Sequence, residues 1–195
     1  SGGGPFALAC AALALGRVTR VGVASGAGPF GLVPGALAAL DETDTAARAL
    51  LPDDPEGAAA GFAAGFAPLA TLFGTATDDE VAAGFGEAMS ARDTVLLAEP
   101  ALRRAFVADM REALRGGTSG GGWDNVAWVG DWSFPLDAVR CPVHLWYGDE
   151  DRFAPLAHGE WLAANLPDSH LTVRPGEGHL GIYEHIDDVL AALTR

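Results

Sequence analysis

Lysine is absent from this chain of 195 residues, and its 12 basic residues, all arginines, face 26 aspartates and glutamates. The formal net charge is -14. An acidic chain of this kind is repelled by the phosphate backbone of nucleic acids. We therefore expect no nucleic-acid partner.

Long hydrophobic runs are missing as well. The longest apolar run, residues 6–15, falls well short of the roughly 20 residues that cross a bilayer, and no basic segment precedes it as in a signal peptide. We expect no membrane partner and a cytoplasmic location. Because the chain opens with Ser1 and not with methionine, we interpret it as processed or as a fragment.

Cysteine is scarce, which limits metal and disulfide chemistry. Cys10 and Cys141 have no CxxC or CxxH neighbour, so we predict two buried free thiols. Four histidines stand singly, without metal-ligand spacing: His144, His158, His170 and His185. We predict no metal site and no cofactor.

Strands alternate with helices at both ends of the chain, whose hydrophobic content of 49% suffices for a core. The apolar segment 6–15 predicts a helix buried on every face, and residues 20–25 predict a short buried strand. Near the other end, the pattern predicts strands at 142–147 and 170–173 and helices at 156–166 and 183–193. This alternation predicts an α/β fold with a mostly parallel sheet flanked by helices.

The middle of the chain has a different pattern, rich in alanine, glycine and phenylalanine and without strand alternation. Thr77 and Glu80 have the spacing of a capping box, apolar residues recur every four positions over 100–115, and 116–122 has the composition of a flexible connector. We predict a helical insertion at 29–129 between core segments 1–28 and 130–195.

The first residues carry a candidate nucleophile. A serine hydroxyl needs a base to remove its proton and amide donors to stabilise the oxyanion. Ser1-Gly2-Gly3 before a predicted helix has the second half of the G-x-S-x-G elbow, in which the N–H after the serine serves the oxyanion. Gly2 is the predicted donor.

A candidate acid and a candidate base follow later strands. The acidic residues Asp149, Glu150 and Asp151 come after the strand at 142–147, where sites of parallel sheets gather. His179 follows the strand at 170–173 on a loop. Serine, acid and histidine in this order are what the hydrolase fold uses.

Three segments, 1–9, 148–155 and 175–180, resemble the elbow, acid and histidine segments of serine-type α/β-hydrolases. In that family the acid segment reads glycine, two variable residues, aspartate, three residues and proline, which selects Asp151. The resemblance covers residues 1–28 and about 132–195, and the segment between corresponds to the helical cap of the family. It implies the α/β-hydrolase fold and a triad of Ser1, Asp151 and His179.

The resemblance implies a serine hydrolase that cleaves an ester-like bond of a small apolar molecule through an acyl-enzyme. Haloperoxidases and carbon–carbon bond hydrolases share the triad, whereas haloalkane dehalogenases have an aspartate where Ser1 stands. We predict that Phe30, Trp123 and Trp128 line the substrate pocket, with packing of the core as the alternative.

Other interpretations remain. Ser1 could use its own amine as the base, as in N-terminal nucleophile hydrolases, or the chain could be a non-catalytic, hydrolase-like binding domain. The first five strands of the α/β-hydrolase fold and the loop with the second oxyanion donor are missing, which would expose a strand edge near Val21. We expect these residues alone to be an inactive truncated fragment that folds poorly. The sequence predicts no oligomeric state.

Overall fold

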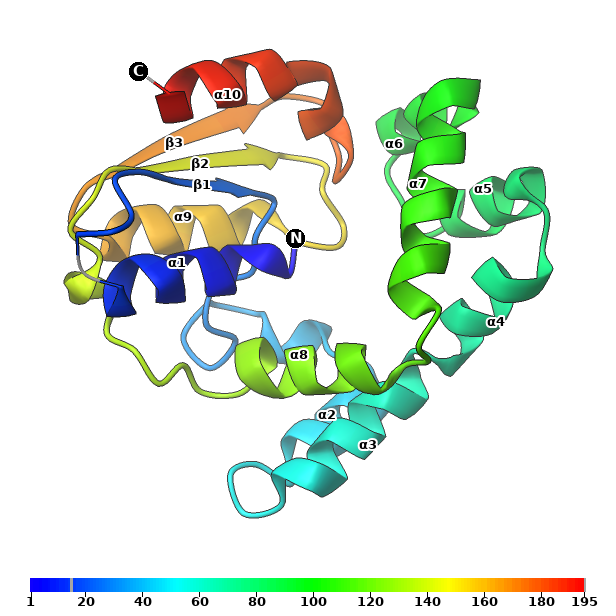
Figure 1. The fold of residues 1–195 in the computed structure, drawn as a ribbon, viewed down its shortest axis with the longest axis horizontal. Helices are drawn as coiled ribbons and strands as arrows, with labels where there is room; N and C mark the ends of the chain where they lie inside the picture. The colour runs from blue at the N-terminus through cyan, green and yellow to red at the C-terminus, as the bar shows by residue number, and fades with distance from the viewer. Residues whose placement is uncertain (15, 195) are drawn as a thin grey trace.

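The computed structural model describes residues 1–14 and 16–194, and its sheet lies between two layers of helices (Figure 1). Its strands are β1 (Val21–Ala24), β2 (Val143–Gly148) and β3 (Ser169–Arg174), in the order β1-β2-β3. Both pairings are parallel. This confirms the predicted parallel α/β sheet and all three predicted strands.

Helices cover both faces of the sheet. α1 (Gly3–Leu13) and α9 (Leu156–Asn165) lie on one face and α10 (Ile186–Thr194) on the other (Figure 1). Short 3-10 helices precede β2 and α10, at η2 (Leu136–Ala138) and η3 (Gly181–His185). Leu15, the last residue of the predicted first helix, lies outside the described residues.

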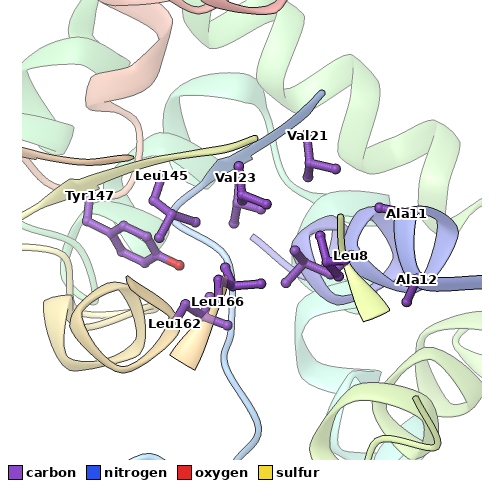
Figure 2. Packing of buried hydrophobic residues seen from close by; sticks show 11 residues of the cluster. Leu8, Ala11, Ala12, Val21, Val23, Leu145, Tyr147, Leu162 and Leu166 are labelled. Atoms are coloured by element: carbon purple, nitrogen blue, oxygen red, sulfur yellow. The ribbon is translucent and has the colours of Figure 1, made fainter. Parts of the chain in front are cut away.

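The main core lies between the sheet and the layer of α1 and α9. Side chains from β1 and β2 meet those of the two helices there, as Figure 2 shows for Leu8, Val23, Leu145, Tyr147 and Leu162. Each of these side chains is at most 1% exposed. Burial of this apolar surface fixes both helices on the sheet.

The expectation that the first helix is buried on every face is wrong. α1 buries Leu8, Ala11 and Ala12, which lie on one side of the helix, while Leu13 is 70% exposed. Cys10 is exposed, so it is not the buried thiol expected, and Cys141 is only partly buried.

Helices fill the chain between β1 and β2, as predicted. They are η1 (Leu37–Ala39), α2 (Glu42–Arg48), α3 (Pro55–Gly65), α4 (Ala67–Thr75), α5 (Asp78–Gly86), α6 (Ala91–Ala98), α7 (Pro100–Leu114) and α8 (Ser119–Val129). No single helix in the described residues is long and apolar enough to cross a membrane; α3 and α4 reach that length only as a pair bent by 40°. We call η1 and α2–α8 the helical insertion; its boundaries at 29 and 129 as a domain stay a prediction.

The helical insertion has separate apolar clusters. α2, α3 and α8 pack around Ala47, Phe62 and Val129, whereas α4, α5 and α7 pack around Phe73 and Val81. The capping box predicted from Thr77 and Glu80 is present at the start of α5. A second capping box, from Ser90 and Asp93, starts α6.

The flexible connector expected at 116–122 is another correction. Gly120, Gly121 and Gly122 are in helix α8. A Cβ atom on Gly122 would collide with the carbonyl oxygen of Ala59 in α3 and press on Ala63. Gly122 therefore permits close packing of α8 on α3. The composition of residues 116–122 alone did not reveal this packing.

Gly122→Ala should lower the free energy of unfolding by about 1–3 kcal/mol, because the added methyl group forces α8 away from α3. Gly120→Ala is the matched control in the same helix. Nothing lies within 4 Å of a Cβ at Gly120. The free energy of unfolding of this variant should therefore rise by up to about 1 kcal/mol, because alanine has the higher helix propensity. Urea denaturation measures both, and equal effects would contradict the packing role of Gly122.

Candidate active site

The carboxyl ends of the strands lie at the same edge of the sheet because the strands are parallel. Ser25 follows β1, Asp151 comes shortly after β2, and His179 follows β3 on the next turn. The sheet thus brings together segments that are more than a hundred residues apart in the chain.

His179 and Asp151 form a close pair at this edge. His179 Nδ1 lies 2.9 Å from Asp151 Oδ2 and 3.1 Å from Oδ1. The Asp151 side chain is 0% exposed and that of His179 is 15% exposed. A carboxylate on Nδ1 keeps the proton there, which leaves Nε2 free to act as a base.

The two neighbouring acidic residues do not contact the imidazole. Asp149 and Glu150 are exposed, and Asp149 instead accepts a hydrogen bond from the Gly176 N–H at 2.7 Å. Of the three acidic candidates, the structure pairs Asp151 with His179.

The environment of Asp151 favours its ionised form. Burial alone would raise the pKa of this carboxyl, but the hydrogen bond and charge of His179 oppose burial, with a further hydrogen bond from the Ala154 N–H. Together they hold the pKa of Asp151 below its ordinary value. Asp151 Oδ1 accepts from the N–H groups of Phe153 and Ala154, each at 2.9 Å.

Ser25 also lies at this edge of the sheet, and the sequence analysis did not single it out. It is buried, and its φ of 48° places it in the left-handed region that residues other than glycine rarely adopt. Its N–H donates to the Trp146 carbonyl at 2.8 Å, which continues the β1–β2 pairing up to the site. A serine directly after a buried strand and before glycine was the available signal.

Ser1 lies at the same edge of the sheet. Its amine donates to the carbonyl of Ala24 at 2.7 Å, next to Ser25, and its carbonyl accepts from the Gly4 N–H at 3.0 Å in the first turn of α1. In the described residues, no hydrogen bond joins the Ser1 hydroxyl to His179. The role of Ser1 as nucleophile stays a prediction, as does that of Gly2, the N-cap of α1.

Aromatic rings lie beside this N-terminus. Phe30 contacts Trp128 with ring centroids 5.5 Å apart and His158 at 5.3 Å. The indole of Trp128 lies where a Cβ on Gly2 would touch it, at 3.6 Å. Trp123 is 47% exposed and forms no aromatic pair among the described residues. The structure therefore brings Phe30 and Trp128 together near Gly2.

His158 was not predicted as a site residue, yet it is buried in this region. Burial lowers the pKa of His158, and its Nδ1 accepts a hydrogen bond from the Gly28 N–H at 2.9 Å. The imidazole is therefore neutral, with its proton on Nε2. Within residues 1–14 and 16–194, no group of three or more metal-ligating side chains is arranged to hold a metal ion.

Curated proteins resemble this chain over short stretches. It is 45% identical over 58 residues to the pimeloyl-(acyl-carrier protein) methyl ester esterase of Aromatoleum aromaticum. This stretch covers 30% of this chain and 23% of that protein. It is 43% identical over 61 residues to the 2-hydroxy-6-oxo-6-phenylhexa-2,4-dienoate hydrolase of Burkholderia cepacia, which covers 31% and 21%. The match thus spans less than a quarter of either relative. No family model matches the chain.

Solved structures resemble it over nearly its whole length. A bromoperoxidase from Bacillus anthracis superposes with a TM-score of 0.56 at 19% identity, over 98% of this chain and 62% of that one. An alpha/beta hydrolase enzyme from a Medee basin deep-sea metagenome library gives a TM-score of 0.52 at 16% identity, over 99% and 61%. An esterase from Rhodococcus sp. ECU1013 gives 0.53 at 13% identity, over 95% and 59%. Likeness at such identities concerns the fold.

Asp151→Asn should lower the free energy of unfolding by about 2–3 kcal/mol at neutral pH, because it removes the charge that accepts the buried hydrogen bonds. The lowered pKa of Asp151 gives the sign of the pH dependence. Its contribution to stability is complete above the ordinary pKa of 3.8 and is lost as the pH falls through the lower folded pKa. The difference between variant and wild type should therefore shrink in acid.

Urea denaturation over a pH series measures this difference. Asp149→Asn is the control, since this exposed carboxylate accepts a single hydrogen bond from Gly176. We expect a loss of at most about 1 kcal/mol from it. A loss at Asp149 as large as that at Asp151 would contradict the electrostatic role of Asp151.

Proposed function

We propose that this chain, which has the α/β-hydrolase fold, belongs to a serine hydrolase that cleaves an ester-like bond of a small molecule. One observation carries the proposal: the buried carboxylate of Asp151 pairs with Nδ1 of His179 at the edge of the sheet where Ser1 precedes helix α1. An imidazole oriented in this way has a free Nε2, which can act as the base for a serine at the same edge of the sheet.

The proposed reaction proceeds through an acyl-enzyme. Ser1 Oγ attacks the substrate carbonyl carbon while His179 Nε2 takes the hydroxyl proton, and Asp151 stabilises the imidazolium that forms. The Gly2 N–H donates to the oxyanion of the tetrahedral intermediate. The imidazolium then gives its proton to the leaving alcohol, and a water deprotonated by His179 releases the acid and restores Ser1.

The relatives support a carbonyl substrate. The names of the curated relatives describe a methyl ester in one case and a 6-oxo acid in the other. Each offers a carbonyl carbon that a serine can attack, so the same residues would serve both. The pair of Phe30 and Trp128 near Gly2 supports an apolar group on the substrate.

His179→Ala should lower kcat for a p-nitrophenyl ester by at least about 10³-fold, because general acid–base catalysis at the serine is lost. The assay uses the protein as the gene encodes it. His170→Ala is the matched control, since this imidazole is largely exposed and contacts Asp168, and it should retain wild-type kcat. An N-terminal nucleophile hydrolase would use the Ser1 amine, so full activity in His179→Ala would favour that mechanism.

A fluorophosphonate probe tests the nucleophile directly. Labelling should occur on Ser1 and should be abolished in Ser1→Ala and strongly slowed in His179→Ala, because the probe reacts with an activated serine hydroxyl. Mass spectrometry of the labelled peptide identifies the residue. A wild-type protein that is folded but does not react would instead be the non-catalytic binding domain.

Trp128→Ala should raise KM for an ester with a long acyl chain by about 10-fold, with a smaller effect on a short acyl chain, because it removes apolar contact area. Trp123→Ala provides the comparison. It removes an equally large ring, which is 47% exposed. If Trp123 lines the substrate pocket as predicted, Trp123→Ala should raise KM by the same factor. Equal KM values for both acyl chains in Trp128→Ala would contradict the role of this ring.

A further inference from the structure

We infer that Asp93, a buried carboxylate of the helical insertion, is a positioning residue that holds the His179 loop in place for catalysis. Asp93 lies in α6 and is 86 positions from His179 in the chain. The His179 N–H donates to Asp93 Oδ2 at 3.0 Å, and the Leu180 N–H donates to Oδ1 at 2.7 Å. The carboxylate thus binds two successive backbone N–H groups of the loop.

The burial of Asp93 makes these hydrogen bonds strong. The residue is 0% exposed, and a buried carboxylate needs donors on both oxygens to offset the loss of hydration. Its other donors are the N–H and the hydroxyl of Ser90, at 3.3 Å and 2.9 Å from Oδ2. Of the four hydrogen bonds that Asp93 accepts, two therefore come from the His179 loop and two from Ser90, the N-cap of its own helix.

Gly178 allows the carboxylate to approach this closely. A Cβ atom there would overlap Asp93 Oδ2 and the Ser90 hydroxyl. The residue before the candidate base therefore has no side chain where the insertion meets the loop. This contact explains the glycine better than chain flexibility, because its φ is not in the left-handed region.

Neighbouring contacts fix the same interface. The Leu180 side chain packs with Met89, Leu96 and Leu97 of the insertion in one buried cluster. Arg92 forms an ion pair with Glu184 beyond the loop, and Phe85 of α5 stacks on Phe153, whose ring lies 5.5 Å from that of His179. Apolar packing holds the insertion on the loop, and Asp93 sets the position of its backbone.

A role in helix capping alone would not account for this geometry. The equivalent residue of α5 is Glu80, which accepts hydrogen bonds from Thr77 and is exposed. Among the described residues, Glu80 contacts no part of the His179 loop. Glu80→Gln is therefore a matched control for Asp93→Asn: each replaces a carboxylate by an amide at the same position of a capping box.

The inference rests on the proposed function, and its experiment measures the rate of fluorophosphonate labelling. In Asp93→Asn the amide NH₂ must face the N–H of either His179 or Leu180, which displaces the loop. We expect the labelling rate constant and kcat to fall about 10- to 100-fold, as a displacement of about 1 Å can cause, with KM nearly unchanged. Glu80→Gln should label at the wild-type rate.

The extent of labelling separates positioning from folding. The amount labelled at saturation counts folded sites, whereas the rate constant reports how well His179 serves Ser1 in those sites. If the role of Asp93 is purely structural, Asp93→Asn should lower the amount labelled at saturation and leave the rate constant unchanged. That result would overturn the inference. Ser90→Ala, which keeps the carboxylate, should slow labelling less than Asp93→Asn.

Amide hydrogen exchange tests the contact without activity, even if Asp93→Asn does not fold. In the wild-type protein, the amides of His179 and Leu180 should be protected at the level of the buried core, although they lie in a loop. Exchange as fast as that of exposed loop amides would overturn the inference. Protected amides in a wild-type protein that no probe labels would instead refute the proposed function, and with it the positioning role of Asp93.

Discussion

The parallel pairing of β2 with both β1 and β3 is the constraint on which the site depends. Ala24 is paired with Trp146, and Gly148 with Arg174, so the chain leaves all three strands at the same edge. A shift of register by one residue would turn the side chains of a strand to the opposite face. The burial of Leu145 and Tyr147 against the helices excludes such a shift and thereby fixes the origin of each functional loop.

Asp151 connects this sheet geometry to electrostatics. A carboxylate without solvent contact is stable only with donors of its own, and those of Asp151 come from its own turn and from His179 after β3. The same charge stabilises an imidazolium. The hydrogen bonds that offset the desolvation of Asp151 are thus the same bonds that the proposed catalysis requires.

The sequence predicted the strands, the helical insertion and the order of the candidate triad, because these follow from periodicity and from motifs next to strand ends. It did not by itself distinguish Asp151 from Asp149 and Glu150; that choice came from the resemblance to a family. Asp93 could not be found, since its capping box has the same pattern as the one at Thr77, and pattern does not reveal contacts distant in the chain. The glycines of α8 suggested a connector because composition contains no information on packing.

The helical insertion contacts the site through both of its halves. α8 reaches Gly2 through Trp128, whereas α6 reaches the His179 loop through Asp93. A rigid movement of α6 away from the core would break the two charge-assisted hydrogen bonds from the loop to Asp93, at a net cost of about 1.5–3 kcal/mol each. These bonds and the packing of Leu180 therefore oppose opening of the α6 half. Under the proposed function, differences in substrate preference would arise at Phe30 and α8, where side chains can change without breaking the hydrogen bonds that hold His179.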